Sequence, residues 1–210
     1  MPSPESGNGN RTGDDTDYNA GGGPVRSLVA GLFAVLVLST AASARQTTTA
    51  TDMPILFEPP LMMGGGGTYT VEESHCGDNY IATWSEAPPI AIIFISLTHN
   101  DCVAADWDVF RRDLSRVFAF FRIDKMFPEA RVEEAVRVTE NDLGRIEYAI
   151  GQLSDAAGMA CVIFRQGFGG MDVNARQGRD KLIGFYCLPF AVDEEYAKSV
   201  AQSLTRNRNW

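Results

Sequence analysis

Four cysteines and two histidines are the residues of this sequence best suited to redox or metal chemistry. The cysteines are Cys76, Cys102, Cys161 and Cys187, and two of the intervals between them span 26 residues each. An even number of cysteines in an exported chain is typical of disulfide bonds, and four cysteines allow three pairings. Cys161 and Cys187 lie in apolar runs on either side of one polar stretch, so we expect them to pair. Cys76–Cys102 then follows by elimination.

Each histidine lies close to a cysteine, in His75-Cys76 and in the stretch from His99 to Cys102. Two imidazoles and two thiolates would make a tetrahedral zinc set. The spacing matches no compact zinc motif, however, and paired cysteines are not metal ligands. We therefore expect no metal and no cofactor.

A hydrolase with a Ser/His/Asp triad would have to use one of these two histidines as its base. The sequence has no G-x-S-x-G nucleophile motif. Asp101 lies two residues from His99, a separation at which side chains on a helix or strand seldom meet. A small secreted hydrolase that uses His99 with a nearby carboxylate remains the alternative function.

A Gly-rich stretch, RQGFGGMDVNARQGRDK, covers residues 165–181. It lacks the order of strand, Gly-rich loop and helix in which backbone amides hold a phosphate. We interpret it as a long hairpin loop that can bind an anion or a partner through Arg165, Phe168, Arg176 and Arg179. The expected ligand is an unknown protein or a small anion.

The compartment is predicted by residues 25–44. Arg26 precedes twelve apolar or small residues, and Ala42 and Ala44 fit an A-x-A cleavage site. The apolar part is shorter than the roughly 20 residues of a spanning helix. This predicts a cleaved signal peptide and a periplasmic or extracellular protein, with a single-pass membrane anchor as the alternative. Residues 1–24 are acidic and Gly-rich, which predicts a disordered tail.

The charge argues against nucleic acid as a partner. The whole chain has a formal net charge of −9, and residues 45–210 hold 16 Lys and Arg against 23 Asp and Glu. No basic stripe is present, so a duplex would be repelled. Contact with a membrane is expected only if residues 25–44 are retained.

The remaining chain predicts a linker followed by one domain. Residues 45–67 are rich in Thr, Pro and Gly, although apolar residues such as Ile55 and Phe57 would also allow this segment to dock on the domain. Residues 68–210 form the predicted disulfide-bonded domain. Alternation predicts strands in TYTVEE, NYIATW, around residues 159–166 and 181–187, and a hairpin around 136–150. The run from Ile90 to Leu97 is apolar throughout, as in a central strand covered on both faces.

Helical periodicity appears twice, at about 101–122, where apolar residues including Trp107, Phe110 and Phe118 form one stripe, and at 193–205, where Asp193 is a capping residue. Together these elements predict an α+β fold: a mainly antiparallel sheet with both helices packed on one face, as a two-layer sandwich. The predicted function is an exported, non-enzymatic binding or accessory module of the cell envelope or the extracellular space.

Overall fold

A nine-stranded antiparallel sheet forms the main part of the structure. The computed structural model describes residues 45–61, 66–85, 88–99, 102, 110, 113–125, 127–154, 158–172 and 177–210. The tail predicted at 1–24 and the signal peptide predicted at 25–44 lie outside these residues. Each helix within them is too short or too polar to cross a bilayer.

Most of the described elements are strands joined as hairpins. In chain order the elements are β1 (Arg45–Thr48), the 3-10 helix η1 (Ala50–Asp52), β2 (Ile55–Phe57), β3 (Thr68–Ser74), β4 (Gly77–Trp84), β5 (Ile90–Thr98), α3 (Arg116–Phe120), η2 (Ile123–Lys125), β6 (Arg131–Val132), β7 (Arg137–Asn141), β8 (Gly144–Ser154), β9 (Met159–Asp172), β10 (Gln177–Leu188), α4 (Glu194–Gln202) and β11 (Leu204–Arg206).

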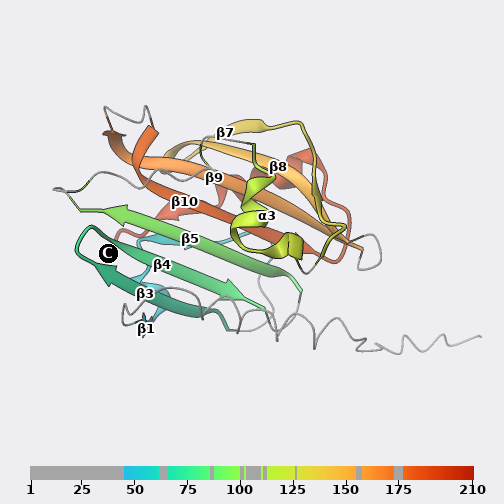
Figure 1. The fold of residues 1–210 in the computed structure, drawn as a ribbon. Helices are drawn as coiled ribbons and strands as arrows, with labels where there is room; N and C mark the ends of the chain where they lie inside the picture. Colours follow the sequence, from blue (N-terminus) through green and yellow to red (C-terminus); the bar gives the residue numbers. More distant parts are fainter. Residues whose placement is uncertain are drawn as a thin grey trace, which may run out of the picture.

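The strands of the large sheet follow the order β1-β3-β4-β5-β10-β9-β8-β6, and β7 also pairs with β8 (Figure 1). β2 and β11 form a separate two-stranded sheet. The hairpin predicted around residues 136–150 is present as β7 and β8, with Asn141 opposite Gly144 across a two-residue turn. All of the described strand pairs are antiparallel.

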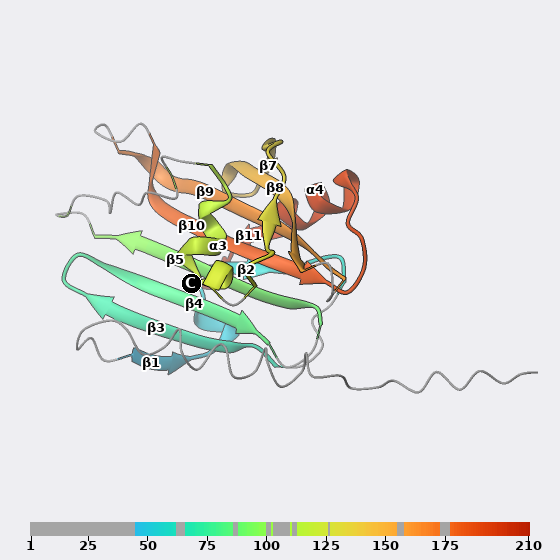
Figure 2. The same ribbon diagram turned by 45° about the vertical axis from the view of Figure 1, so that its right-hand side comes forward.

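The central strands send apolar side chains to both faces of the sheet. On β5, Ile92 belongs to one buried cluster and Ile93 to the other, and on β10 Phe185 and Tyr186 divide in the same way. The cluster of Ile92 and Phe185 is covered by α3, whereas that of Ile93 and Tyr186 is covered by α4 and the β2–β11 pair. Figures 1 and 2 show α3 in front of the sheet and α4 behind it.

The predicted α+β two-layer sandwich with both helices on one face is therefore wrong. Val117 and Phe118 of α3 are buried on one face, and Ala197 and Val200 of α4 on the other. An apolar stripe shows which side of a helix is buried, but it does not show which face of a sheet the helix covers. The predicted helices at 101–122 and 193–205 correspond to Arg116–Phe120 and Glu194–Gln202, and residues 103–109 lie outside the description.

The segment from residue 45 to 61, predicted as part of a linker, packs on the domain. β1 pairs with β3, and β2 pairs with β11. Met53 and Ile55 are 2% and 5% exposed, in the cluster that α4 covers. The apolar residues of this segment therefore take the docked position.

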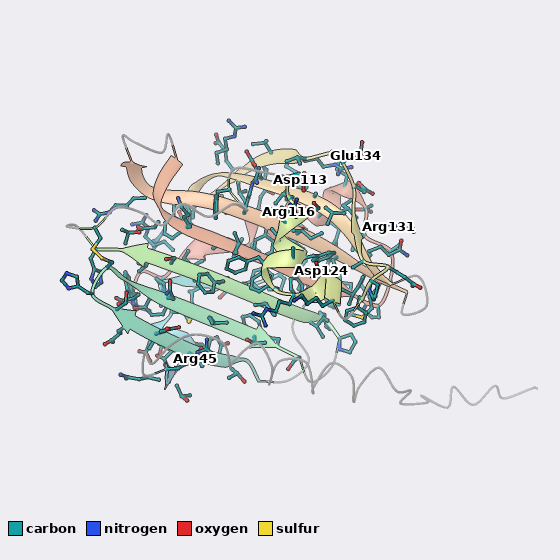
Figure 3. The ribbon with its side chains drawn as sticks, in the orientation of Figure 1. Arg45, Asp113, Arg116, Asp124, Arg131 and Glu134 are labelled. Carbon is teal, nitrogen blue, oxygen red and sulfur yellow. A yellow bond between two sulfur atoms is a disulfide. The ribbon has the colours of Figure 1, made fainter. Side chains whose placement is uncertain are left out.

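Both predicted disulfide bonds are present, Cys76–Cys102 and Cys161–Cys187. Each joins the open end of a hairpin: the first closes β4 and β5, and the second links residues directly opposite each other in β9 and β10. Because β5 places Ile90 opposite Cys187, the two bonds lie at opposite ends of the sheet. Figure 3 shows the Cys76–Cys102 bond in yellow, at the ends of β4 and β5.

Candidate functional site

A pocket of about 770 Å³ opens at the Cys76–Cys102 end of the sheet, on the face that α4 covers; we call it the Arg206 pocket. The chain terminus Trp210, marked C, lies near the same ends of β4 and β5 in Figure 1, and its ring contacts the ring of Tyr80 on β4. Side chains from five strands and the C-terminal segment line the pocket, among them Ile55, Asp78, Leu97, His99, Leu143, Phe168, Asp180, Arg206, Arg208 and Trp210.

One wall of the pocket is the sheet itself. Leu97 on β5, Phe168 on β9 and Asp180 on β10 reach the same face because adjacent antiparallel strands place paired residues on one side. Asp180 Oδ1 accepts a hydrogen bond from the backbone N–H of Thr98 at 2.9 Å, which joins β10 to the end of β5. Phe168 is 9% exposed and belongs to the buried cluster beneath α4.

The opposite wall is the C-terminal segment, and Asn207 fixes it. The Asn207 side-chain amide donates to the carbonyls of Thr51 and Met53 at 2.9 and 2.8 Å, and its backbone N–H donates to the Pro54 carbonyl at 3.0 Å. Asn207 is 5% exposed, whereas its neighbours Arg206 and Arg208 are exposed. This clamp holds the backbone between the two arginines that line the pocket.

His99 lies at the rim of the pocket with both ring nitrogens facing oxygen acceptors. Nε2 is 3.3 Å from Asp78 Oδ2, and Nδ1 is 3.2 Å from the carbonyl oxygen of His75. The Cys76–Cys102 bond holds the backbone here: the His99 N–H donates to the Cys76 carbonyl at 3.0 Å. Among the described residues, no Ser, Thr or Cys side chain has a hydrogen bond to this imidazole.

Asp180 is a partly buried charged residue of the pocket. Burial raises the pKa of its carboxyl, although the Thr98 N–H and the nearby Arg179 and Arg206 act in the opposite direction. Gly169 passes close to the carboxyl with a φ of +76°, and a Cβ at position 169 would overlap Asp180 Oδ2. Glycine is therefore required at position 169 both by its backbone conformation and by this close approach.

Three of the four residues predicted for an anion- or partner-binding loop are described, and these three do not all line the pocket. Phe168 lines the pocket, and Arg179 lies at its edge, where Nη2 donates to the His99 carbonyl oxygen. Arg165 pairs with Glu147 on β8, with Nη2 2.7 Å from Oε2, and its strand position places it on the face that α3 covers. Arg176 lies outside the described residues.

The Gly-rich stretch is mostly strand where it is described. β9 continues to Asp172 and β10 begins at Gln177. Of the predicted long loop, only residues 173–176 lie between these strands, and they are not described. Backbone pairing continues past the glycines, with a register shift between Gly178 and Asp180. Glycines in a strand can mark a bulge as well as a loop, and here they belong to an irregular hairpin.

Sequence reasoning missed Asp78, Asp180, Arg206, Arg208 and Trp210 as pocket residues. One signal was present for Asp78. The sequence contains a turn signal at Pro88 and Pro89, and we expected a disulfide bond between positions 76 and 102. A hairpin closed in this way brings Asp78 close to His99. The structure agrees, since Asp78 pairs with Leu97. Arg206 and Arg208 were missed because the sequence predicted a helix as far as residue 205. In the structure α4 ends at Gln202, and the strand β11 replaces the last turn of the predicted helix.

No group of three or more His, Cys, Asp and Glu side chains in the described ranges is arranged to hold a metal ion. The chain matches no protein-family model, no curated protein and no solved structure.

Proposed function

We propose that this protein is an exported, non-enzymatic binding module and that the Arg206 pocket is its ligand site. The observation that carries the proposal is the pocket itself: about 770 Å³, with apolar side chains at its base and charged groups from both walls. Small-molecule sites are typically concave, largely preformed and about 300–1,000 Å³ in volume, with a few polar groups that orient the ligand.

The two disulfide bonds support the exported location. Such bonds persist in oxidising compartments and are rare where glutathione keeps thiols reduced. A periplasmic or extracellular site of action follows if residues 25–44 are cleaved, and a membrane-tethered module follows if they are retained. N-terminal sequencing of the protein recovered from its native cells separates these forms, since cleavage after Ala44 leaves Arg45 as the first residue.

A fragment screen tests the binding role. We expect members of a mixed library of neutral, cationic and anionic fragments to shift the amide resonances of Leu143, Gly169 and Trp210. Leu143→Trp fills the pocket and should abolish these shifts. Val138→Trp adds the same indole to an exposed position of the same hairpin, outside the pocket, and should leave them unchanged. If no fragment of any charge binds in the pocket, the binding role is refuted.

A small secreted hydrolase is the second candidate, and the pair His99–Asp78 favours it. A carboxylate 3.3 Å from an imidazole is the arrangement that orients a general base. Against this role, Nδ1 and Nε2 each lie within hydrogen-bond distance of a protein oxygen, so neither nitrogen is directed at an open position for a nucleophile or water. A broad hydrolase screen of wild type beside His99→Ala decides the question: activity that the substitution removes supports the hydrolase, whereas activity equal in both proteins excludes His99 as its base.

A further inference from the structure

We propose that the ligand of the Arg206 pocket is an organic anion with an apolar body, its charged group held by Arg206 and Arg208 and its body by Phe168, Leu97 and Trp210. This inference rests on the proposed binding function and adds the chemical class of the ligand.

The two arginines supply positive charge that has no hydrogen-bond acceptor among the described residues. Neither guanidinium has a hydrogen bond or an ion pair with any described residue, although both line the pocket. Guanidinium groups match the geometry of carboxylates and phosphates through two parallel N–H donors. Because Asn207 fixes the backbone between them, the two side chains start from a defined position, which reduces the entropy lost when a ligand is bound.

The carboxylates of the pocket already have partners. Asp78 Oδ2 faces His99 Nε2 at 3.3 Å, and Asp180 Oδ1 accepts from the Thr98 N–H at 2.9 Å. Burial also raises the pKa of Asp180, which disfavours its charged form. The two guanidinium groups are therefore the charged groups of the pocket that have no hydrogen-bond partner among the described residues, and they would attract a ligand anion and repel a ligand cation.

The apolar side chains of the pocket favour a ligand with an apolar body over an inorganic ion. Leu97 and Phe168 lie on the sheet wall of the pocket, and Phe168 is part of the buried cluster. Trp210 is 58% exposed, an unusually open position for the largest apolar side chain, and its ring meets the ring of Tyr80 edge-on at 6.1 Å. A phosphate or sulfate ion would fill a small part of about 770 Å³ and would leave this surface uncovered.

Three naphthalene probes of equal size and different charge test the inference: 2-naphthoate, 2-naphthol and 2-naphthylmethylammonium, with inorganic phosphate as a small anion. Each is titrated into the oxidised full-length protein at pH 7 and followed by amide chemical shifts and calorimetry. We expect 2-naphthoate to bind most tightly, with an affinity that falls as salt is added, because salt screens the guanidinium charges.

The variant Arg206→Gln/Arg208→Gln should lower the affinity for 2-naphthoate at least tenfold, since a hydrogen bond to a charged group contributes about 1.5–3 kcal/mol. Arg116→Gln is the matched control. Arg116 is exposed on α3, on the opposite face of the sheet (Figure 3), and its removal should leave the affinity unchanged. Circular dichroism and thermal unfolding establish that both variants are folded.

The possible outcomes separate the inference from the binding function. If 2-naphthol or the ammonium probe binds in the pocket as tightly as 2-naphthoate, or if the double variant keeps full affinity, the anionic class is overturned while the pocket remains a site. If phosphate binds as tightly as 2-naphthoate, the apolar body is overturned. If no probe binds there and the fragment screen is also negative, both proposals fail together.

Discussion

The two disulfide bonds span equal sequence separations at opposite ends of the sheet, but one is buried and the other lies near the surface. Cys161–Cys187 joins directly opposed residues of β9 and β10, and both cysteines are fully buried in the cluster that α3 covers. Cys76–Cys102 joins residues of the same separation at the other end, where Cys76 is exposed and the bond lies beside the rim of the Arg206 pocket. At one end the cross-link adds to a complete core. At the other it holds a backbone turn at the rim of the pocket that we propose as the ligand site.

Removing the buried bond should have the largest effect on stability. Both bonds close loops of 26 residues, so the chain-entropy model assigns each of them about 3.5 kcal/mol. Cys161→Ala/Cys187→Ala also empties the space of two sulfur atoms in a packed core, which costs roughly 1–2 kcal/mol more. Urea unfolding of this variant beside Cys76→Ala/Cys102→Ala measures the difference, because the equal loop lengths cancel. An equal loss in both variants would refute a separate contribution from burial.

Removing the exposed bond should affect the pocket as well as stability. In Cys76→Ala/Cys102→Ala we expect a loss of about 3.5 kcal/mol and a several-fold weaker affinity for 2-naphthoate, because the bond holds the His99 turn at the rim. Cys161→Ala/Cys187→Ala, measured at a temperature where it is folded, should keep its affinity. Calorimetry with the two variants tests this.

Selective reduction compares the two disulfide bonds without substitutions. A mild thiol reductant should reach the Cys76–Cys102 bond first because Cys76 is exposed, and alkylation followed by mass spectrometry identifies the cysteines released. Equal rates for the two bonds, or a pocket unaffected by the loss of the exposed one, would contradict the division of roles between the two ends.

The sequence predicted best what depends on local pattern. The strands β3, β4, β9 and β10 and the β7–β8 hairpin follow from alternation and turn residues, and β5 follows from its continuous apolar run, whereas the two-residue strand β6 was not predicted. Asp193 caps α4 as expected, since its side chain accepts a hydrogen bond from the Tyr196 N–H at 2.8 Å. The cysteine pairing follows from spacing and flanking residues. Each of these depends on neighbours in the chain, which the sequence displays directly.

The sequence predicted least well what depends on distant contacts. The faces covered by α3 and α4 are decided by packing, and the apolar run from Ile90 to Leu97 already implied that both faces need cover. The pocket combines Asp78, Phe168 and Arg206, which lie far apart in the chain. Sheet register and the β2–β11 pair bring them together, and neither can be derived from a local pattern. Of the pocket residues, Phe168 was identified through its place in the Gly-rich stretch and His99 as the base of the alternative hydrolase.

The smallest expected effect is the pH dependence of folding stability that the pocket residue Asp180 contributes. Burial raises the pKa of its carboxyl in the folded state above the value in the unfolded chain. The folded protein therefore holds this proton more strongly. The resulting stabilisation is complete below the unfolded pKa and is lost as the pH rises through the folded one.

Asp180→Asn removes this titration and keeps an oxygen that can accept from the Thr98 N–H. The stability of the variant relative to wild type should therefore increase between pH 3 and pH 7, by a small amount because the carboxyl is only partly buried. Urea unfolding across this range measures it, with Asp124→Asn, an exposed carboxyl beside α3 (Figure 3), as the control. A relative stability that falls with pH would mean that the charged form of Asp180 is favoured by the fold, and the pocket would then hold a carboxylate that opposes a ligand anion.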